Sequence, residues 1–277
     1  MPTYQDSEIR PMQRKTTVDH WDTAWAQRPR PRLPTGLDVG TRSVQAVIRR
    51  KIRPGMNVLE IGCAPGKMLG WVAKSLGAGV SGVDYSPQGV EVTRWMMGEM
   101  GIDADIRQED IFETSFAPGS FDVVYSNGVI EHFDDPRELV AIHVRLLRPG
   151  GTAIILIPNY GGIYGRLQRH FDPENLAIHN LSIMNESALQ GLVSPSDGDQ
   201  ITVYRTGLPS PWIVSWQRRW GAMGLYFSWA MNVVSLILPV RPASLRPLLV
   251  LEIRREEGDT PQCMSILTAC REDSCHV

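Results

Sequence analysis

The sequence VLEIGCAPGKML, residues 58–69, is the most informative segment for the fold of this chain. It places a short apolar run ending in an acid before Gly62 and Gly66, and a segment with helical apolar spacing after them. This order is typical of a buried parallel strand that turns sharply into a helix. Glycine permits a positive φ and removes Cβ atoms that would hold a ligand away from the backbone, while the N–H groups at the helix start can receive polar ligand groups. The turn is therefore expected to bind a ligand.

Predicted strands and helices alternate from residue 56 onward. The strands are expected at 58–61, 80–83, 104–107, 121–125 and 152–157, and the helices between them at 67–76, 87–100 and 136–147. A helix at 185–193 and strands at 200–205 and 248–253 follow, and two helices around 21–25 and 36–51 come first. The order predicts parallel pairing through helical crossovers, hence a doubly wound, Rossmann-like α/β fold. Ligands of such sheets bind outside the carboxyl ends of the strands.

Composition excludes several classes of function. The 277 residues carry a net charge of −2, which gives no reason to expect nucleic acid as a partner. Four cysteines do not suggest a disulfide scaffold, and the first residues contain no apolar segment of a signal peptide, so a cytoplasmic protein is expected. The spacing of Cys263, Cys270 and Cys275 matches no common zinc pattern, and no metal site is predicted.

The segment Glu60-Ile61-Gly62-Cys63-Ala64-Pro65-Gly66 resembles the first motif, of E-x-G-x-G-x-G type, of class I S-adenosylmethionine-dependent methyltransferases. Alanine, the next smallest residue, replaces the middle glycine. Met68 after the lysine does not fit a phosphate-binding Walker loop, and the glycine spacing does not fit a dinucleotide fingerprint. Taken alone, this motif could also be interpreted as a tight turn in any other α/β protein.

Two later positions match the same family in register. Asp84, at the end of the second predicted strand, can accept two hydrogen bonds from a ribose diol. Its alternative role is an N-cap before Pro87, for which Ser86 is better placed. The resemblance implies that Asp110 accepts from the adenine amino group and that Ile111 covers the ring, with a solvated loop as the alternative.

The stretch SFDVVYSNGVIEHFDDP, residues 120–136, resembles the family's fourth motif in a variant ending Glu-His. This variant recurs among small-molecule methyltransferases such as those of quinone biosynthesis. Asn127 would hold the amino group of the methyl donor or the substrate. His132, beside Glu131, could remove a proton from an acceptor hydroxyl, or could merely cap the next helix and orient the loop.

Together these matches imply a set of site residues. The cofactor-binding residues are Glu60, Gly62, Cys63, Ala64, Gly66, Asp84, Tyr85, Asp110, Ile111 and Asn127, and the catalytic residues are His132 and Glu131. Tyr160, Tyr164, His170 and His179 are further candidates for the acceptor side, each with a structural role as its alternative.

The chain is expected to divide into an N-terminal arm (1–52), an S-adenosylmethionine-binding core (53–160), an acceptor side with closing strands (161–256) and a polar tail (257–277). An apolar insertion at 208–246 interrupts the acceptor side, and its residues 220–240 carry no charge. A transmembrane helix is disfavoured by the glycine, serine, asparagine and proline within it. A helical lid, a peripheral membrane contact through 212–240 and a plain packing hairpin are the alternatives left open.

The resemblance implies a seven-stranded sheet that is mostly parallel and is closed by an antiparallel hairpin of the last two strands. It also implies S-adenosylmethionine as cofactor and transfer of its methyl group to oxygen on a small apolar or lipid-like acceptor. Alternatives are N- or C-methylation of a small molecule or lipid-linked sugar, aminopropyl transfer, and a non-catalytic S-adenosylmethionine-binding protein. The expected location is the cytoplasm, with peripheral contact at a membrane, and the oligomeric state is left open.

Overall fold

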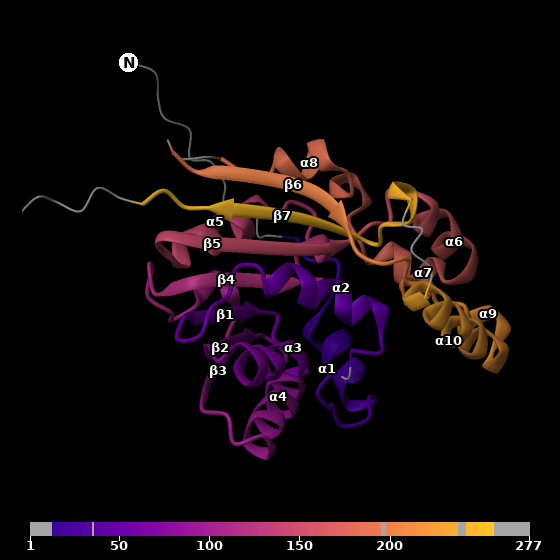
Figure 1. Ribbon diagram of the computed structural model, residues 1–277, viewed down its shortest axis with the longest axis horizontal. Helices are drawn as coiled ribbons and strands as arrows, with labels where there is room; N and C mark the ends of the chain where they lie inside the picture. The colour runs from indigo at the N-terminus through magenta and orange to yellow at the C-terminus, as the bar shows by residue number, and fades with distance from the viewer. Residues whose placement is uncertain (1–12, 35, 195–197, 238–241, 258–277) are drawn as a thin grey trace, which may run out of the picture.

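A seven-stranded sheet forms the centre of the molecule, with strand order β3-β2-β1-β4-β5-β7-β6 (Figure 1). The computed structural model describes residues 13–34, 36–194, 198–237 and 242–257. The strands are β1 Asn57–Ile61, β2 Gly79–Asp84, β3 Ala104–Gln108, β4 Phe121–Asn127, β5 Leu147–Pro158, β6 Gln200–Thr206 and β7 Leu248–Arg254. The first five pair in parallel, and β7 runs antiparallel to both β5 and β6. The predicted Rossmann-like sheet with an antiparallel closing hairpin is confirmed.

Ten α-helices accompany these strands in the described residues. They are α1 Val18–Ala26, α2 Val39–Ile48, α3 Lys67–Trp71, α4 Pro87–Glu99, α5 Arg137–Leu146, α6 Ile163–Phe171, α7 Pro173–Ala177, α8 Glu186–Gln190, α9 Gln217–Trp220 and α10 Ala222–Ile237. A π-helical turn, Val72–Leu76, continues α3 over the length predicted for that helix.

Several predicted boundaries differ from the structure, among them those of the helix expected at 36–51, which is α2 Val39–Ile48. The strand expected to begin at Thr152 already begins at Leu147. Leu147 directly follows α5, has extended dihedral angles and pairs with Phe121 of β4; the register of the two strands then shifts between Phe121 and Val123. The helix expected at 185–193 ends at Gln190. The predicted tail, apart from Glu257, lies outside the described residues.

The sheet buries apolar residues on both faces. Along β4, Val123 and Tyr125 pack with α2, α3 and α4, whereas Val124 between them packs with α5, α6 and α8. Because neighbouring side chains of a strand point to opposite faces, a strand covered on both sides reads as a continuous apolar run. The runs in the sequence therefore predicted the strands well.

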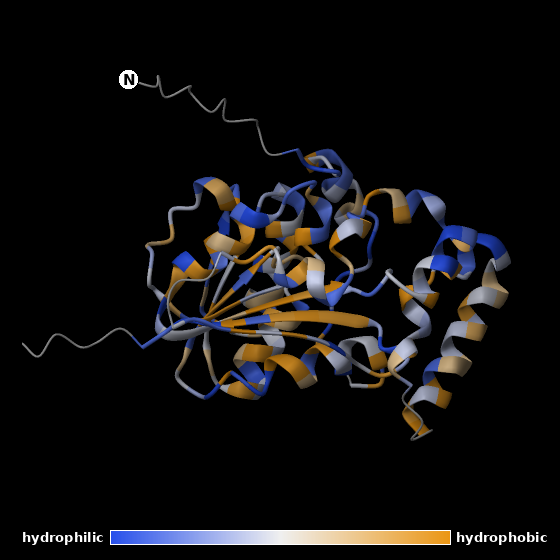
Figure 2. Cartoon of the chain, turned by 90° about the horizontal axis from the view of Figure 1, so that it is seen from above, coloured by the Kyte–Doolittle hydropathy of each residue, from blue (hydrophilic) through white to orange (hydrophobic). Residues whose placement is uncertain are grey.

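The insertion between β6 and β7 forms a protrusion at one end of the molecule, built mainly from α9 and α10 (Figures 1 and 2). Asn232 anchors α10 to the start of α2: its side chain accepts from the Val39 N–H at 3.0 Å and donates to the Leu37 carbonyl at 2.8 Å. Among the described residues, no helix is long and apolar enough to cross a membrane.

We predict that Gly82→Ala destabilises the fold and shifts the turn after β1. A Cβ atom at this buried position in β2 would lie 2.8 Å from both Cβ and Sγ of Cys63. Overpacking of this kind costs about 1–3 kcal/mol in free energy of unfolding. Urea unfolding followed by circular dichroism measures the change.

Gly98→Ala in α4 is the matched control. A Cβ atom there has no neighbour within 4 Å, so we expect stability to stay unchanged or to rise by up to about 1 kcal/mol. Equal stability of the two variants would contradict the close packing of Gly82 on Cys63.

Candidate active site

A cavity of about 370 Å³ opens at the carboxyl ends of β1, β2 and β4. Residues from all the sequence motifs line it, including Glu60, Asp84, Asp110 and Asn127. Its volume lies within the range of small-molecule sites. The topology predicts this location, because parallel strands end at a common edge of the sheet.

The glycine turn forms part of the cavity wall. Gly62 has φ +71°, and an added Cβ there would lie 2.6 Å from Val129. Cys63 and Ala64 also line the cavity. Gly66, with φ +83°, is not among the lining residues; an added Cβ there would meet Thr93 and Met97 of α4 at 3.1 and 3.2 Å. Gly66 thus lets α3 pack against α4, and as the N-cap of α3 it supplies no side chain to satisfy the first N–H groups.

Asp84 is buried beside this turn. Its carboxylate accepts from the Ala64 N–H at 3.2 Å and the Ser86 N–H at 2.9 Å. Burial raises the pKa of the carboxyl. Ser86, and not Asp84, caps α4, because its hydroxyl accepts from the Gly89 N–H at 2.9 Å. The Asp84 carboxylate therefore supports the turn while lining the cavity.

Glu60 contributes a second buried carboxyl to the cavity wall. It lies opposite Tyr125 in the pairing of β1 with β4, and it is 5% exposed. Its Oε2 atom has no hydrogen-bond partner among the described residues. Burial, with a smaller contribution from the charge of Asp84, raises its pKa to about 8. A cationic ligand group would stabilise the ionised form.

Asp110 has a partner that the sequence did not indicate. Its carboxylate forms an ion pair with Arg14 and accepts from the Phe112 N–H at 3.2 Å. The Arg14 guanidinium also lies over the ring of Tyr85, 5.0 Å from the centroid. Ile111, next to Asp110, is buried and lines the cavity.

The N-terminal arm covers the cavity. Trp21 and Trp25 of α1 line it with their rings stacked, the centroids 6.0 Å apart. Asp22 ties α1 to the start of α4, accepting from the Ser86 hydroxyl and from the Gln88 N–H. The signal in the sequence was the helical spacing of Trp21 and Trp25, four residues apart, which indicates one apolar face of a short helix. None of the described residues of the insertion lines the cavity, so the arm, not the insertion, provides its cover.

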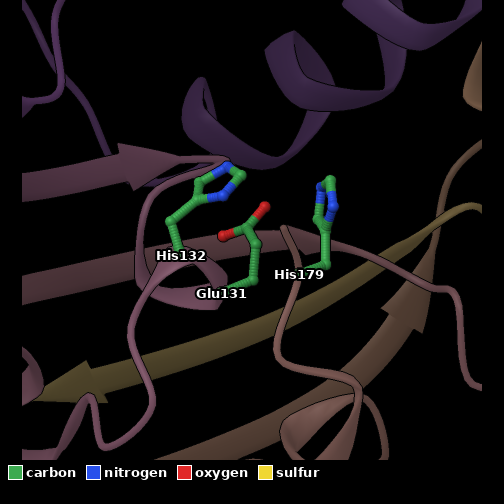
Figure 3. Close-up of side chains that lie close together, drawn as sticks. All are labelled: Glu131, His132 and His179. Carbon is green, nitrogen blue, oxygen red and sulfur yellow. The ribbon is translucent and has the colours of Figure 1, made fainter. Parts of the chain in front are cut away.

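His132 lines the cavity, whereas Glu131 and His179 do not; the three side chains lie side by side (Figure 3). The Nδ1 atom of His132 bonds with the Ile178 carbonyl at 2.9 Å, so the ring does not cap α5. Burial lowers the pKa of His132 to about 4, with a smaller contribution from His179. Burial also raises the pKa of Glu131 to about 8. His132 is therefore unprotonated at neutral pH but a weak base.

The other candidates for the acceptor side separate in the structure. The hydroxyl groups of Tyr160 and Tyr164 donate to the carbonyls of Ile213 and Leu245, at 3.0 and 2.8 Å. His170 is exposed at the surface. The ring of Tyr160 packs edge-on against His179, and His179 joins the Glu-His pair with its ring centroid 4.8 Å from that of His132. Sequence spacing could not reveal this contact, because His179 comes from a distant loop between α7 and the turn Leu181–Ile183.

Comparison with known proteins agrees with this architecture. Residues 59–155 match the family described as a methyltransferase domain. A ubiquinone biosynthesis O-methyltransferase from Xanthomonas campestris is 34% identical over 137 residues, which are 49% of this chain and 54% of that protein. A ribosomal protein L11 methyltransferase from Thermosipho africanus is 39% identical over 98 residues, 35% of this chain and 36% of that protein. The chain thus spans about half or less of the length of these curated relatives.

Among solved structures, a phosphoethanolamine N-methyltransferase of Haemonchus contortus in complex with S-adenosylhomocysteine superposes with a TM-score of 0.58. It is 18% identical, and the match covers 87% of this chain and 58% of that one. The match over residues 59–155, the strand order and the cavity lined by the motif residues together show that the core of this chain contains a methyltransferase domain with the fold of class I, S-adenosylmethionine-dependent methyltransferases.

Proposed function

We propose that this protein transfers a methyl group from S-adenosylmethionine to oxygen on a small apolar or lipid-like acceptor. The observation that carries the proposal is the cavity at the ends of β1, β2 and β4, which brings the predicted motif residues to one place. Relatives named as O-methyltransferases support oxygen as the acceptor atom.

The residues present suit this cofactor. The unpartnered Oε2 of Glu60 would accept from the amino group of its methionine part. The first N–H groups of α3, which the N-cap Gly66 has no side chain to satisfy, would receive the carboxylate. Asp84 would accept from the ribose hydroxyls. Tyr85 and Ile111 would flank the adenine, with Asp110 on its amino group. A carboxylate offers about four lone-pair sites, so Asp110 can accept from adenine while paired with Arg14.

S-adenosylmethionine supplies a methyl group on a sulfonium, which is already a good leaving group. The protein therefore has mainly to align the acceptor oxygen in line with the methyl carbon and to help the oxygen lose its proton. Trp21, Trp25 and Phe133 would keep water away from the reacting atoms. Glu131 and His132 are the proposed catalytic residues, and Asn127 would hold the donor's amino group or the acceptor.

Helix α10 supports a peripheral membrane contact through residues 212–240, of which 238–240 lie outside the described part of the chain. Its large apolar side chains point outward: Met223, Tyr226, Trp229 and Ile237 are 76, 77, 66 and 74% exposed. Its buried residues are the small or polar Gly224, Ser228, Asn232 and Ser235. An ordinary surface helix buries its apolar face and exposes its polar face, whereas α10 does the opposite. Exposed apolar patches of this kind mark interaction sites.

Basic residues beside α10 favour an anionic lipid surface as the partner. Arg218 and Arg219 of α9 lie next to the apolar helix, and exposed Arg166 and Arg169 of α6 lie nearby, since Arg219 donates to the His170 carbonyl at 2.8 Å. Apolar side chains flanked by arginines are typical of helices that rest in the headgroup region. The few cysteines favour the cytoplasmic face of a membrane.

We predict that Asp84→Asn weakens binding of S-adenosylmethionine and S-adenosylhomocysteine at least tenfold, because the amide cannot accept both ribose hydroxyls. Calorimetric titration of the purified protein measures the affinity. Asp105→Asn, at an exposed carboxylate of β3, is the matched control and should bind normally. No binding of either ligand to the wild-type chain would refute the proposed function.

His132→Ala tests the catalytic side separately. It should bind S-adenosylhomocysteine like the wild type but should transfer radiolabelled methyl groups at least tenfold more slowly to a panel of apolar phenols. Unchanged transfer would remove His132 from the catalytic residues.

We predict that Glu60→Gln changes how stability depends on pH in the cofactor-free protein. The pKa of Glu60 rises from 4.5 to about 8 on folding, so the folded chain keeps a proton that the unfolded chain releases. This contribution to stability is fully present below pH 4.5 and is lost as the pH rises towards 8. Relative to Glu60→Gln, the wild type should lose on the order of 1 kcal/mol per pH unit over this window. Urea unfolding of both proteins at pH 5 and pH 8 measures it; an equal difference at the two pH values would contradict the shift.

The membrane contact is tested with vesicles. Tyr226→Asp combined with Trp229→Asp should lower co-sedimentation with phosphatidylglycerol vesicles about tenfold, because both charges would enter the headgroup region. Tyr226→Phe combined with Trp229→Phe is the control and should bind like the wild type. Vesicle binding that is unchanged in the double aspartate variant, or a wild-type dimer that buries α10, would refute the lipid contact.

A further inference from the structure

Three potential metal ligands converge beside the cavity. Glu131 and His132 come from the turn Ile130–His132 after β4, and His179 comes from the loop after α7. One ligand atom from each, a carboxylate oxygen and two ring nitrogens, all lie within 4.8 Å of one another. Figure 3 shows the Glu131 carboxylate between the two imidazole rings.

One oxygen of the Glu131 carboxylate lacks a hydrogen-bond donor. The residue is 1% exposed, and its Oε2 has no hydrogen-bond partner among the described residues. The cations of the adjacent arm have other partners: Lys15 pairs with Asp134, and Arg14 pairs with Asp110. A buried, unpartnered carboxylate oxygen is costly, and a bound cation would offset that cost.

Both histidines are oriented as metal ligands usually are. The Nδ1 atoms of His132 and His179 lie 2.9 and 2.7 Å from the carbonyl oxygens of Ile178 and Asn175. A carbonyl oxygen only accepts, so each Nδ1 carries the proton and each Nε2 keeps a free lone pair. Donation from the second ring nitrogen to a backbone carbonyl is the usual support of a metal-bound histidine.

The two loops that carry the ligands are tied together. The Asn180 N–H donates to the Glu131 carbonyl at 2.6 Å, and its side-chain amide donates to the carbonyls of Phe133 and Asp134, both at 2.9 Å. The ring of Trp21 packs edge-on against His132, at 5.1 Å between centroids, and Tyr160 packs in the same way against His179, at 5.2 Å. These contacts hold the three ligands in one arrangement.

We propose that Glu131, His132 and His179 bind one divalent transition-metal cation of the zinc type. Two imidazoles and one carboxylate suit such a cation, and three protein ligands leave the fourth position open, as in catalytic zinc sites. Metal–ligand distances of about 2.1 Å place tetrahedral ligand atoms about 3.4 Å apart, so the side chains would draw together on binding.

The role of the cation rests on the proposed function. An acceptor hydroxyl at the open position would lose its proton to water more easily, because the cation lowers its pKa. The oxygen lone pair then forms the bond to the methyl carbon, and the electron pair of the breaking S–CH3 bond stays on sulfur, leaving S-adenosylhomocysteine. His132 would thus act as a ligand and not as the proton acceptor.

The test uses the full-length protein with any affinity tag removed. After dialysis against EDTA, titration with zinc chloride or cobalt chloride should give one equivalent bound per chain, and cobalt should give a visible absorption band. His179→Gln and Glu131→Gln should each weaken the metal affinity at least tenfold while S-adenosylhomocysteine still binds. His170→Gln, at an exposed histidine outside the cluster, is the matched control, and circular dichroism checks that each variant is folded.

Failure to bind zinc, cobalt or manganese stoichiometrically would overturn the site, as would binding that survives unchanged in both variants. Methyl transfer that continues undiminished after EDTA treatment would overturn the role of the cation and leave the proposed function standing. Metal binding without any affinity for S-adenosylhomocysteine would refute the proposed function and leave the metal site standing.

Discussion

The buried carboxylate of Asp84 holds together the parts of the molecule on which the cavity depends. It accepts from the Ala64 N–H in the turn after β1 and from the Ser86 N–H at the start of α4. The turn can approach β2 this closely because Gly82 has no side chain where Cys63 packs. The same carboxylate faces the cavity, so the residue that supports the turn is also available to a ligand.

The N-terminal arm joins the cavity to the cluster of Glu131, His132 and His179. Its tryptophans cover the cavity, and its backbone reaches the loop of the proposed ligands, where the Lys15 N–H donates to the His132 carbonyl at 2.8 Å. Trp21 contacts His132 directly. A movement of the arm on ligand binding would therefore change the contacts of His132 and shift the cluster of Glu131, His132 and His179.

The composition of the insertion could not show which of its side chains face the protein and which face outward. A charge-free segment can be core, lid or surface. In this chain Asn232 and the small residues of α10 pack inward, because their short side chains allow close contact with α2 and the preceding turn. The large apolar side chains are left outside, at the opposite side of the helix from these contacts.

Local patterns in the amino-acid sequence are enough to predict the strands, their parallel pairing and the edge of the sheet where Glu60, Asp84 and Asp110 meet. These follow from local patterns: apolar runs, glycine at the turn after β1 and acids at strand ends. Three other features became known from the three-dimensional structure: Arg14 pairs with Asp110, Gly66 packs on α4 instead of lining the cavity, and His179 joins Glu131 and His132. Each of these contacts links residues far apart in the chain, and no local periodicity encodes such a contact, because it depends on how loops and helices dock after the sheet has formed.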